Sequence, residues 1–234
     1  MRARAIRTMV AVAVLALSAA GWADNSGVIT VNASASGWYA AWNPGATDPQ
    51  LDTNAKPNSL QNYVAWNDGY IVNNFFVFDL AGVTGPIISP SELNLLIPAQ
   101  GVYAPNGSLT YTLFDVSTPV SDLLAGVPSS SILDDLGSGI SFGSAVVTES
   151  DNGTVFVVSF NQAGIAALNS SLGGLFAIGG SITSGTGYAF GYTGGQVPYL
   201  TLDPPSVPEP ASLVLFGSGL IGLATCMRSK RRRG

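Results

Sequence analysis

Short alternations of apolar and polar residues fill the chain between Asp24 and Val207, and clusters of Gly, Pro, Asn and Asp separate them. Alternation with a period of two places apolar side chains on one face of an extended strand. The dipeptides Asn106-Gly107 and Asn152-Gly153 are typical of tight turns between strands. The pattern predicts strands at residues 28–32, 38–42, 63–66, 74–80, 92–96, 109–116, 141–148, 155–160, 175–178, 188–192 and 199–202.

Helical periodicity is rare in the same stretch. The clearest helix is predicted at residues 162–170, where Asn161 can serve as the N-cap and Gly173-Gly174 can end the helix. Two short helical turns are predicted at residues 121–125 and 131–136.

Many short strands with one well-formed helix predict an all-β fold. We expect a jelly-roll-like β-sandwich over residues 24–202, with the helix as a short crossover packed on the end of a sheet. A Pro-rich segment follows, so residues 203–210 are predicted to form a stiff, extended spacer. The predicted domain holds no cysteine, so burial of apolar side chains and sheet hydrogen bonds must stabilise it.

The N-terminal end has the three parts of a secretory signal peptide. Residues 1–7 carry three Arg, and residues 8–20 are uncharged and mostly apolar. Gly21-Trp22-Ala23 offers small residues for cleavage before Asp24, and Ser18-Ala19-Ala20 is the alternative site. The apolar run would span about 20 Å as a helix, less than the hydrocarbon core of about 30 Å. Residues 1–23 are therefore predicted to be a signal helix that is removed on export, with an uncleaved anchor as the alternative.

The C-terminal end resembles a membrane span. Residues 211–227 carry no charge, and Pro210 stands where a helix can begin. Residues 228–234 form a basic tail, which would stay in the cytoplasm by the positive-inside rule. The bases of this tail are Arg228, Lys230, Arg231, Arg232 and Arg233. The sequence thus predicts a transmembrane helix at 211–227, with everything before it outside the cell.

Pro208, Glu209 and Pro210, the apolar helix and the Arg-rich end occur in that order at the C-terminus. This arrangement resembles the PEP-CTERM sorting signal of exported bacterial proteins. The resemblance implies that a membrane enzyme, exosortase, removes the helix near the Pro-Glu-Pro motif. The domain would then be delivered to the cell surface or the extracellular matrix. A plain C-terminal membrane anchor is the alternative.

A second resemblance concerns the predicted strands. Residues 76–80, followed by residues 88–95, resemble the paired strands of jelly-roll modules in secreted carbohydrate-acting proteins. This resemblance implies an architecture and assigns no binding residue.

The distribution of charge and the missing residue types exclude several classes of catalysis and binding. Eight of the nine Lys and Arg lie in the first seven or last seven positions, whereas Lys56 is the one base between Asp24 and Val207, a stretch with thirteen acids. The chain has no His and one Cys, Cys226, which excludes Ser-His and Cys-His nucleophile pairs, His-ligated metals and an internal disulfide. The scarcity of bases argues against phosphoryl transfer and nucleic-acid binding. We therefore expect a protein that is not an enzyme.

Aromatic residues concentrate in one segment, residues 38–70, and alternate there with Asn, Asp and Gln. Flat aromatic rings beside amide groups suit the apolar faces and hydroxyl edges of sugars. The alternative is that these rings pack in the core or at a strand edge. The candidate glycan-binding residues are Trp38, Trp42, Tyr63 and Trp66.

Acidic residues offer two further hypotheses. Asp48 with Asp52, Asp134 with Asp135, and Asp151 with Asn152 are candidate ligands for Ca²⁺, although none has the D-x-D-x-D-G pattern. A glycoside hydrolase needs only two carboxylates. The candidates for this pair are Asp134, Asp135, Glu92 and Glu149. Apart from a candidate Ca²⁺, no cofactor is expected.

Together the patterns predict an exported bacterial protein with a non-enzymatic structural or adhesive role at the cell surface or in the matrix. Its expected partners are an exosortase, the membrane before processing, and extracellular polysaccharide, with no nucleic acid. A carbohydrate-binding module and a two-carboxylate glycoside hydrolase are the alternatives.

Overall fold

The computed structural model describes residues 27–42, 50–52, 62–194 and 196–204. They belong to one compact unit, Gly27–Pro205. The predicted signal peptide, the spacer beyond Pro204, the transmembrane helix at 211–227 and the basic tail at 228–234 lie outside the described residues. In the described part, no helix has the length and apolar character needed to cross a membrane.

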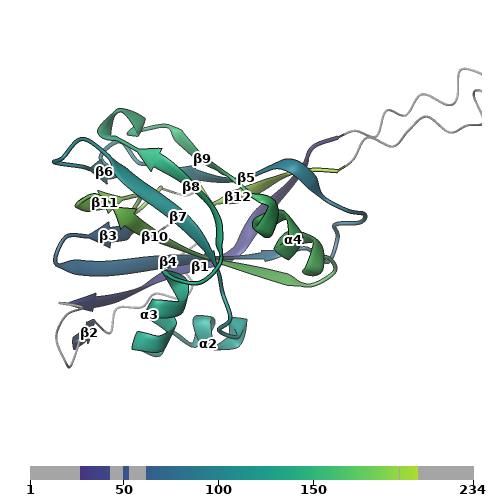
Figure 1. Ribbon diagram of the computed structural model, residues 1–234, viewed down its shortest axis with the longest axis horizontal. Coiled ribbons are helices and arrows are strands. Elements are labelled where there is room, and N and C mark those ends of the chain that lie inside the picture. Colours follow the sequence, from purple (N-terminus) through teal and green to yellow (C-terminus); the bar gives the residue numbers. More distant parts are fainter. Residues whose placement is uncertain (1–26, 43–49, 53–61, 195, 205–234) are drawn as a thin grey trace, which may run out of the picture. The chain divides into compact units, whose positions relative to one another are not determined.

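The described chain is mostly antiparallel β-sheet, as the alternation predicts, and its main strands form two layers (Figure 1). One layer has the order β1 (Ile29–Trp42), β12 (Tyr199–Asp203), β5 (Ile88–Leu96), β9 (Val155–Ser159). The other has the order β4 (Tyr70–Asp79), β10 (Leu175–Ser184), β7 (Leu109–Asp115), β8 (Ser141–Val147).

Strand β1 joins the two layers. Its first part pairs with β12 from Ile29 to Asn32, and its second part pairs with β4 from Ala33 to Trp42, with a register shift after Ala33. The predicted strands at 28–32 and 38–42 are therefore one long strand.

Four short strands complete the sheets. β2 (Gln50–Asp52) pairs with β1. The other three form a row beside the first residues of β4. The strand β3 (Ala65–Asn67) pairs with β4, β11 (Gly187–Ala189) pairs with β3, and β6 (Val102–Tyr103) pairs with β11. The alternation did not predict β2 or β6. β3 and β11 are also short, but they overlap the predicted strands at 63–66 and 188–192.

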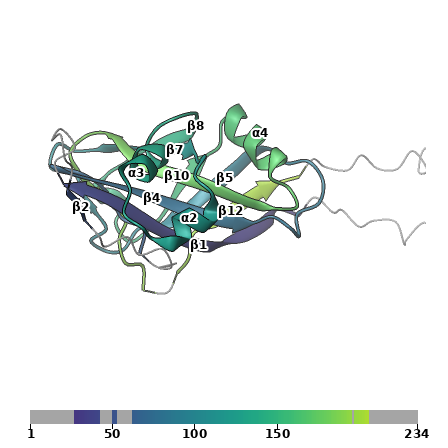
Figure 2. The same cartoon turned by 90° about the horizontal axis from the view of Figure 1, so that it is seen from below.

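The described residues contain three α-helices, where the sequence predicts one helix and two helical turns. They are α2 (Val120–Ala125), α3 (Ser130–Leu136) and α4 (Gln162–Ser170). The Asn161 side chain caps α4 by accepting a hydrogen bond from the Gly164 amide at 3.0 Å. α4 leads from β9 in one layer to β10 in the other and contacts β8 and β5, so it is a crossover helix. Figure 2 shows α4 apart from α2 and α3.

Strand β4 is buried on both faces. Phe76 and Phe78 belong to the main core between the two layers, whereas Phe75 and Val77 belong to a second core under α2 and α3. On that side the Tyr39 hydroxyl donates a hydrogen bond to the Leu123 carbonyl of α2 at 2.9 Å. Burial on both faces explains why the apolar residues 75–78 follow one another in this strand and do not alternate with polar residues.

A chain of buried polar groups ties the layers together. The Tyr111 hydroxyl donates to Asn74 Oδ1 at 2.6 Å, and Asn74 Nδ2 donates to the Tyr63 carbonyl at 2.7 Å. The Tyr63 hydroxyl in turn donates to the Leu96 carbonyl at 2.9 Å. A side chain at Gly180 would overlap the Tyr111 hydroxyl, so glycine is required there. Burial raises the pKa of both tyrosines, Tyr111 and Tyr63.

Candidate glycan-binding surface

The four predicted glycan-binding residues occupy different environments. Tyr63 is fully buried and its ring packs edge-on against Phe76 at 5.5 Å, so it lies in the core and not on a surface. Trp38 is partly buried on β1, and its Nε1 is buried without a hydrogen-bond partner. Trp42 ends β1, where its backbone pairs with Tyr70. Trp66 lies on β3 among other aromatic rings.

Trp66 is part of a row of rings across neighbouring strands. The register of β3, β11 and β6 places Trp66 opposite Tyr188 and Tyr188 opposite Tyr103. The residues beside them on the same strands, Ala65, Ala189 and Val102, are buried in the main core. Because side chains alternate along a strand, the three rings point away from that core.

The row has a fourth member and regular spacing. Ring centroids are 5.7 Å apart for Tyr70 and Trp66, 5.5 Å for Trp66 and Tyr188, and 5.8 Å for Tyr188 and Tyr103. Tyr103 is 46% exposed and the other three rings are partly exposed. We call these four residues, Tyr70, Trp66, Tyr188 and Tyr103, the aromatic row.

Two local features hold the row in register. The exposed Asp68-Gly69 turn connects β3 to β4, with Gly69 at a φ of 70°, and so brings Tyr70 beside Trp66. A side chain at Gly187 would overlap the Tyr103 carbonyl, and its φ of 138° also favours glycine. Glycine at this position therefore allows β11 to approach β6 closely enough for the Tyr188 and Tyr103 rings to meet.

Of the four rings in this row, sequence reasoning named only Trp66 as a binding residue, although Tyr70 ends the predicted aromatic segment at residues 38–70. Tyr103 and Tyr188 lie far from Trp66 along the chain, and only the strand register brings them together. A signal was present for Tyr188, which the alternation places at the start of a predicted strand. No signal of this kind exists for Tyr103, because β6 has two residues.

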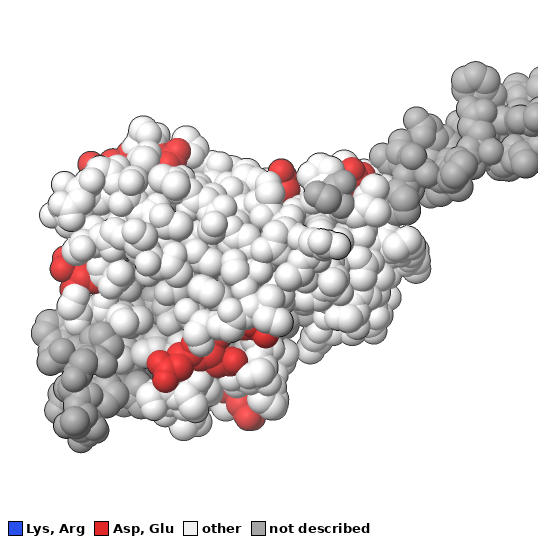
Figure 3. Space-filling model, in the orientation of Figure 1, with Lys and Arg blue, Asp and Glu red and all other residues white. Residues whose placement is uncertain are grey.

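Carboxylates lie near both ends of the row. Asp68 is exposed in the turn between Trp66 and Tyr70. Glu149 accepts a hydrogen bond at its Oε1 from the amide of Ala104, the residue after Tyr103, at 3.1 Å. None of the described residues is Lys or Arg. The face drawn in Figure 3 accordingly shows scattered red carboxylates and no blue atoms.

The carboxylate of Asp135, another acidic candidate, is bonded within the protein. Both carboxylate oxygens of Asp135 accept hydrogen bonds from the amides and hydroxyls of Ser117 and Thr118, at 2.6–3.2 Å. Partial burial acts to raise the pKa of Asp135, but these hydrogen bonds outweigh it and the pKa is lowered. Asp135, which is on α3, thus holds in place the segment that connects β7 to α2.

The remaining candidates do not assemble into one cluster. Asp134 and Asp135 are on α3, Glu92 is on β5 and Glu149 is in the short 3-10 helix Glu149–Asp151. Asp151 caps that helix, and Asn152 Oδ1 accepts from the Val102 amide at 2.8 Å. Asp48 and the side chain of Asp52 are outside the described part. Within the described part, no three His, Cys, Asp or Glu side chains form a group that could hold a metal ion.

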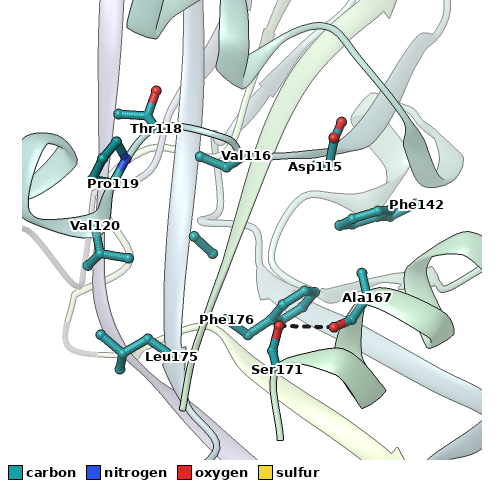
Figure 4. A pocket seen from close by; sticks show the side chains of 11 residues that line it. Asp115, Val116, Thr118, Pro119, Val120, Phe142, Ala167, Ser171, Leu175 and Phe176 are labelled. Carbon is teal, nitrogen blue, oxygen red and sulfur yellow. Dashed lines mark hydrogen bonds between the residues drawn. The ribbon is translucent and has the colours of Figure 1, made fainter.

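A hollow of about 330 Å³ lies beside α4 (Figure 4). Phe142, Leu175 and Phe176 supply much of its apolar lining. Its polar groups are already bonded: the Ser171 hydroxyl donates to the Ala167 carbonyl at 2.9 Å, and the Thr118 hydroxyl donates to Asp135. The hollow therefore lacks the convergent polar groups that orient a bound ligand.

The C-terminal end matches a known sorting signal. A comparison with protein families finds the PEP-CTERM protein-sorting motif at residues 206–232, a range that contains Pro208, Glu209 and Pro210. A comparison with curated proteins gives no match. The chain therefore carries a C-terminal exosortase-substrate signal, as the tripartite pattern predicted. This signal implies export, membrane anchoring before processing, and sorting by exosortase toward the surface.

Proposed function

We propose that the domain is a non-enzymatic adhesive component of the cell surface or extracellular matrix, and that it holds polysaccharide on the aromatic row. The sorting motif supports a place at the surface. The single observation that carries the binding hypothesis is the row of four neighbouring rings from four strands.

Aromatic rings at a partly exposed position can contact the apolar faces of sugar rings, while tyrosine hydroxyls remain available to sugar hydroxyls. Several rings in line can contact successive sugar units, so weak individual contacts add along one chain. The row thus favours a polymer over a single sugar. It replaces the four residues predicted from sequence, of which only Trp66 belongs to it.

We also infer that the fold is a jelly roll. The two layers contain four main strands each, and the connections β4–β5, β5–β7, β8–β9, β9–β10 and β10–β12 all cross between layers. Strand β1 lies beside β12, the first strand beside the last. These crossing connections support two Greek keys wound into a double-sheet jelly roll.

A catalytic role has less support. The carboxylates considered for a glycoside hydrolase lie on separate elements or serve as hydrogen-bond acceptors for the backbone. We therefore propose that the protein holds polysaccharide without cleaving it, and that its signal helix, membrane span and basic tail act as the sequence predicts.

The test is polysaccharide binding by the full-length chain in mild detergent, measured by affinity electrophoresis in gels containing soluble polysaccharides. The wild type should be retarded, and Tyr103→Ala should lose most of the retardation because it removes the most exposed ring. Tyr192→Ala is the matched control, since Tyr192 is 67% exposed and has no ring of the aromatic row as a neighbour. Equal retardation of all three proteins, or none with any polysaccharide, would reject the proposal.

A further inference from the structure

The charge and tilt of the aromatic row restrict the polysaccharide that it can take. We infer that the row binds an uncharged polysaccharide, as a single dissolved chain, and excludes polyuronates and crystalline polysaccharide surfaces. This inference rests on the proposed function, because it names the ligand class of the same surface.

The exclusion of acidic chains follows from the carboxylates at the ends of the row. Asp68 lies in the turn beside Trp66 and Tyr70, and Glu149 is bonded to the amide that follows Tyr103. A chain lying along the row would pass both carboxylates. At physiological ionic strength charges act over a Debye length of about 8 Å, and at low salt over longer distances. A polyuronate carries a carboxylate on every sugar, so Asp68 and Glu149 would repel it at both ends of the row.

No cation among the described residues could offset this repulsion. Proteins hold carboxylates with Arg or Lys, which donate charge-assisted hydrogen bonds. The described residues include ten acids whose side chains are placed and no Lys or Arg. An uncharged sugar needs no such partner, because it binds through its apolar face and its hydroxyl groups.

The tilt of the rings argues for a single chain. Neighbouring rings are inclined by 38° for Tyr70 and Trp66, 56° for Trp66 and Tyr188, and 30° for Tyr188 and Tyr103. Because no plane is common to the four rings, the flat face of a crystalline polymer could lie on only part of the row. A dissolved chain can turn from one ring to the next and contact them all.

The direction of such a chain also follows from the register. The four rings come from β4, β3, β11 and β6, which pair in that order. The bound chain would therefore run across the strands and not along one of them, which places Asp68 and Glu149 at opposite ends of its path.

The experiment compares three probes with the full-length chain in detergent. Soluble mixed-linkage β-glucan and polygalacturonate are titrated by calorimetry at low and high salt, and crystalline cellulose is tested by co-sedimentation. We expect β-glucan binding that changes less than twofold with salt and falls at least tenfold in Tyr103→Ala. Polygalacturonate should not bind at low salt, and cellulose should not sediment the protein.

Charge variants separate local repulsion from the overall charge of the domain. Asp68→Asn should allow measurable polygalacturonate binding, whereas Asp134→Asn, which removes the same charge from an exposed position on α3, should not. Asp134→Asn should bind β-glucan as the wild type does. For Asp68→Asn, β-glucan binding is the control that the turn still holds the row in register, because the substitution keeps the size of the side chain.

The outcomes distinguish the inference from the proposed function. Polygalacturonate binding at low salt that Tyr103→Ala abolishes would overturn the inferred ligand class and leave polysaccharide binding in place. Co-sedimentation with cellulose as strong as β-glucan binding would overturn the single-chain inference. Binding to none of the three probes would overturn both.

Discussion

The side chain of Asn169 forms hydrogen bonds with both backbone groups of Ile87. Its Nδ2 donates to the Ile87 carbonyl at 2.8 Å, and its Oδ1 accepts from the Ile87 amide at 2.7 Å. The two residues are 82 positions apart, at the end of α4 and just before β5. This pair docks the crossover helix onto the layer from which the chain has just come, while the rest of α4 contacts β8 in the other layer.

Asn169→Ala should therefore destabilise the protein. The substitution leaves the amide and carbonyl of Ile87 without these partners, and an unsatisfied buried polar group costs about 1–3 kcal/mol. The free energy of unfolding in urea measures the loss. Gln162→Ala changes an exposed side chain on the same helix and should stay within about 0.5 kcal/mol of the wild type. A similar effect of both variants would contradict the role of the pair.

The stability of the domain should fall at alkaline pH. Burial raises the pKa of Tyr111 and of Tyr63 above the value that each has in the unfolded chain, about 10. Above pH about 10 the unfolded state then binds fewer protons than the folded state, so stability decreases as the pH rises. Each buried tyrosine contributes a slope of up to about 1.4 kcal/mol per pH unit. Urea unfolding between pH about 9 and 12 checks this.

Tyr111→Phe provides the corresponding variant. Near neutral pH it should cost about 1–3 kcal/mol, because Asn74 Oδ1 loses its donor in the core. Above pH about 10 its stability should fall less steeply than that of the wild type, since one titrating group is gone. Tyr192→Phe, at an exposed position, should change neither quantity. Parallel pH profiles for wild type and Tyr111→Phe would show that Tyr111 does not titrate on unfolding.

Asp135 should make the opposite contribution, at acid pH. The hydrogen bonds from Ser117 and Thr118 lower its pKa despite partial burial. Its contribution is therefore fully present above the ordinary carboxyl pKa of about 4, and is lost as the pH falls through the lowered value. Asp135→Asn should cost about 1 kcal/mol at pH 7 and less near pH about 2. Asp134→Asn should have little effect at either pH, and a cost equal to that of Asp135→Asn would contradict the prediction.

Gly187→Ala should disturb the aromatic row by moving β11 away from β6. Overlap with the Tyr103 carbonyl would push β11 from β6, and such overpacking costs about 1–3 kcal/mol. Gly107 also has a positive φ, 98°, but a side chain there would contact no other atom. Gly107→Ala therefore measures backbone strain alone. We expect Gly187→Ala to be the less stable and to lose polysaccharide retardation, while Gly107→Ala keeps it. Retention by Gly187→Ala would show that the Tyr188–Tyr103 contact is dispensable.

Local signals predicted the described helices α2, α3 and α4 well. Asn161 is recognisable as a cap from its position before an apolar periodic segment, and α4 begins and ends where the sequence predicts. α2 and α3 also lie within one residue of the predicted turns. Such features depend on neighbours in the chain, so a single sequence contains them.

The aromatic row depends on pairing between distant segments. Tyr63 and Trp66 look equivalent in the sequence, but one is a core residue with its hydroxyl bonded to Leu96 and the other stands on the outer side of β3. Their roles differ because Tyr63 precedes the strand and packs against β4, whereas Trp66 is placed by its register with Tyr188. Register is set by turns and by the core as a whole, so the surface could not be read from residue type.

The position of β12 has a mechanical consequence. The C-terminal segment that carries the sorting signal continues from this strand, so any load on that attachment enters the domain through β12. β12 is flanked on one side by β1 and on the other by β5. Tension directed along the strand would have to shear both sets of hydrogen bonds at once, so the strand that bears the pull is braced on each side.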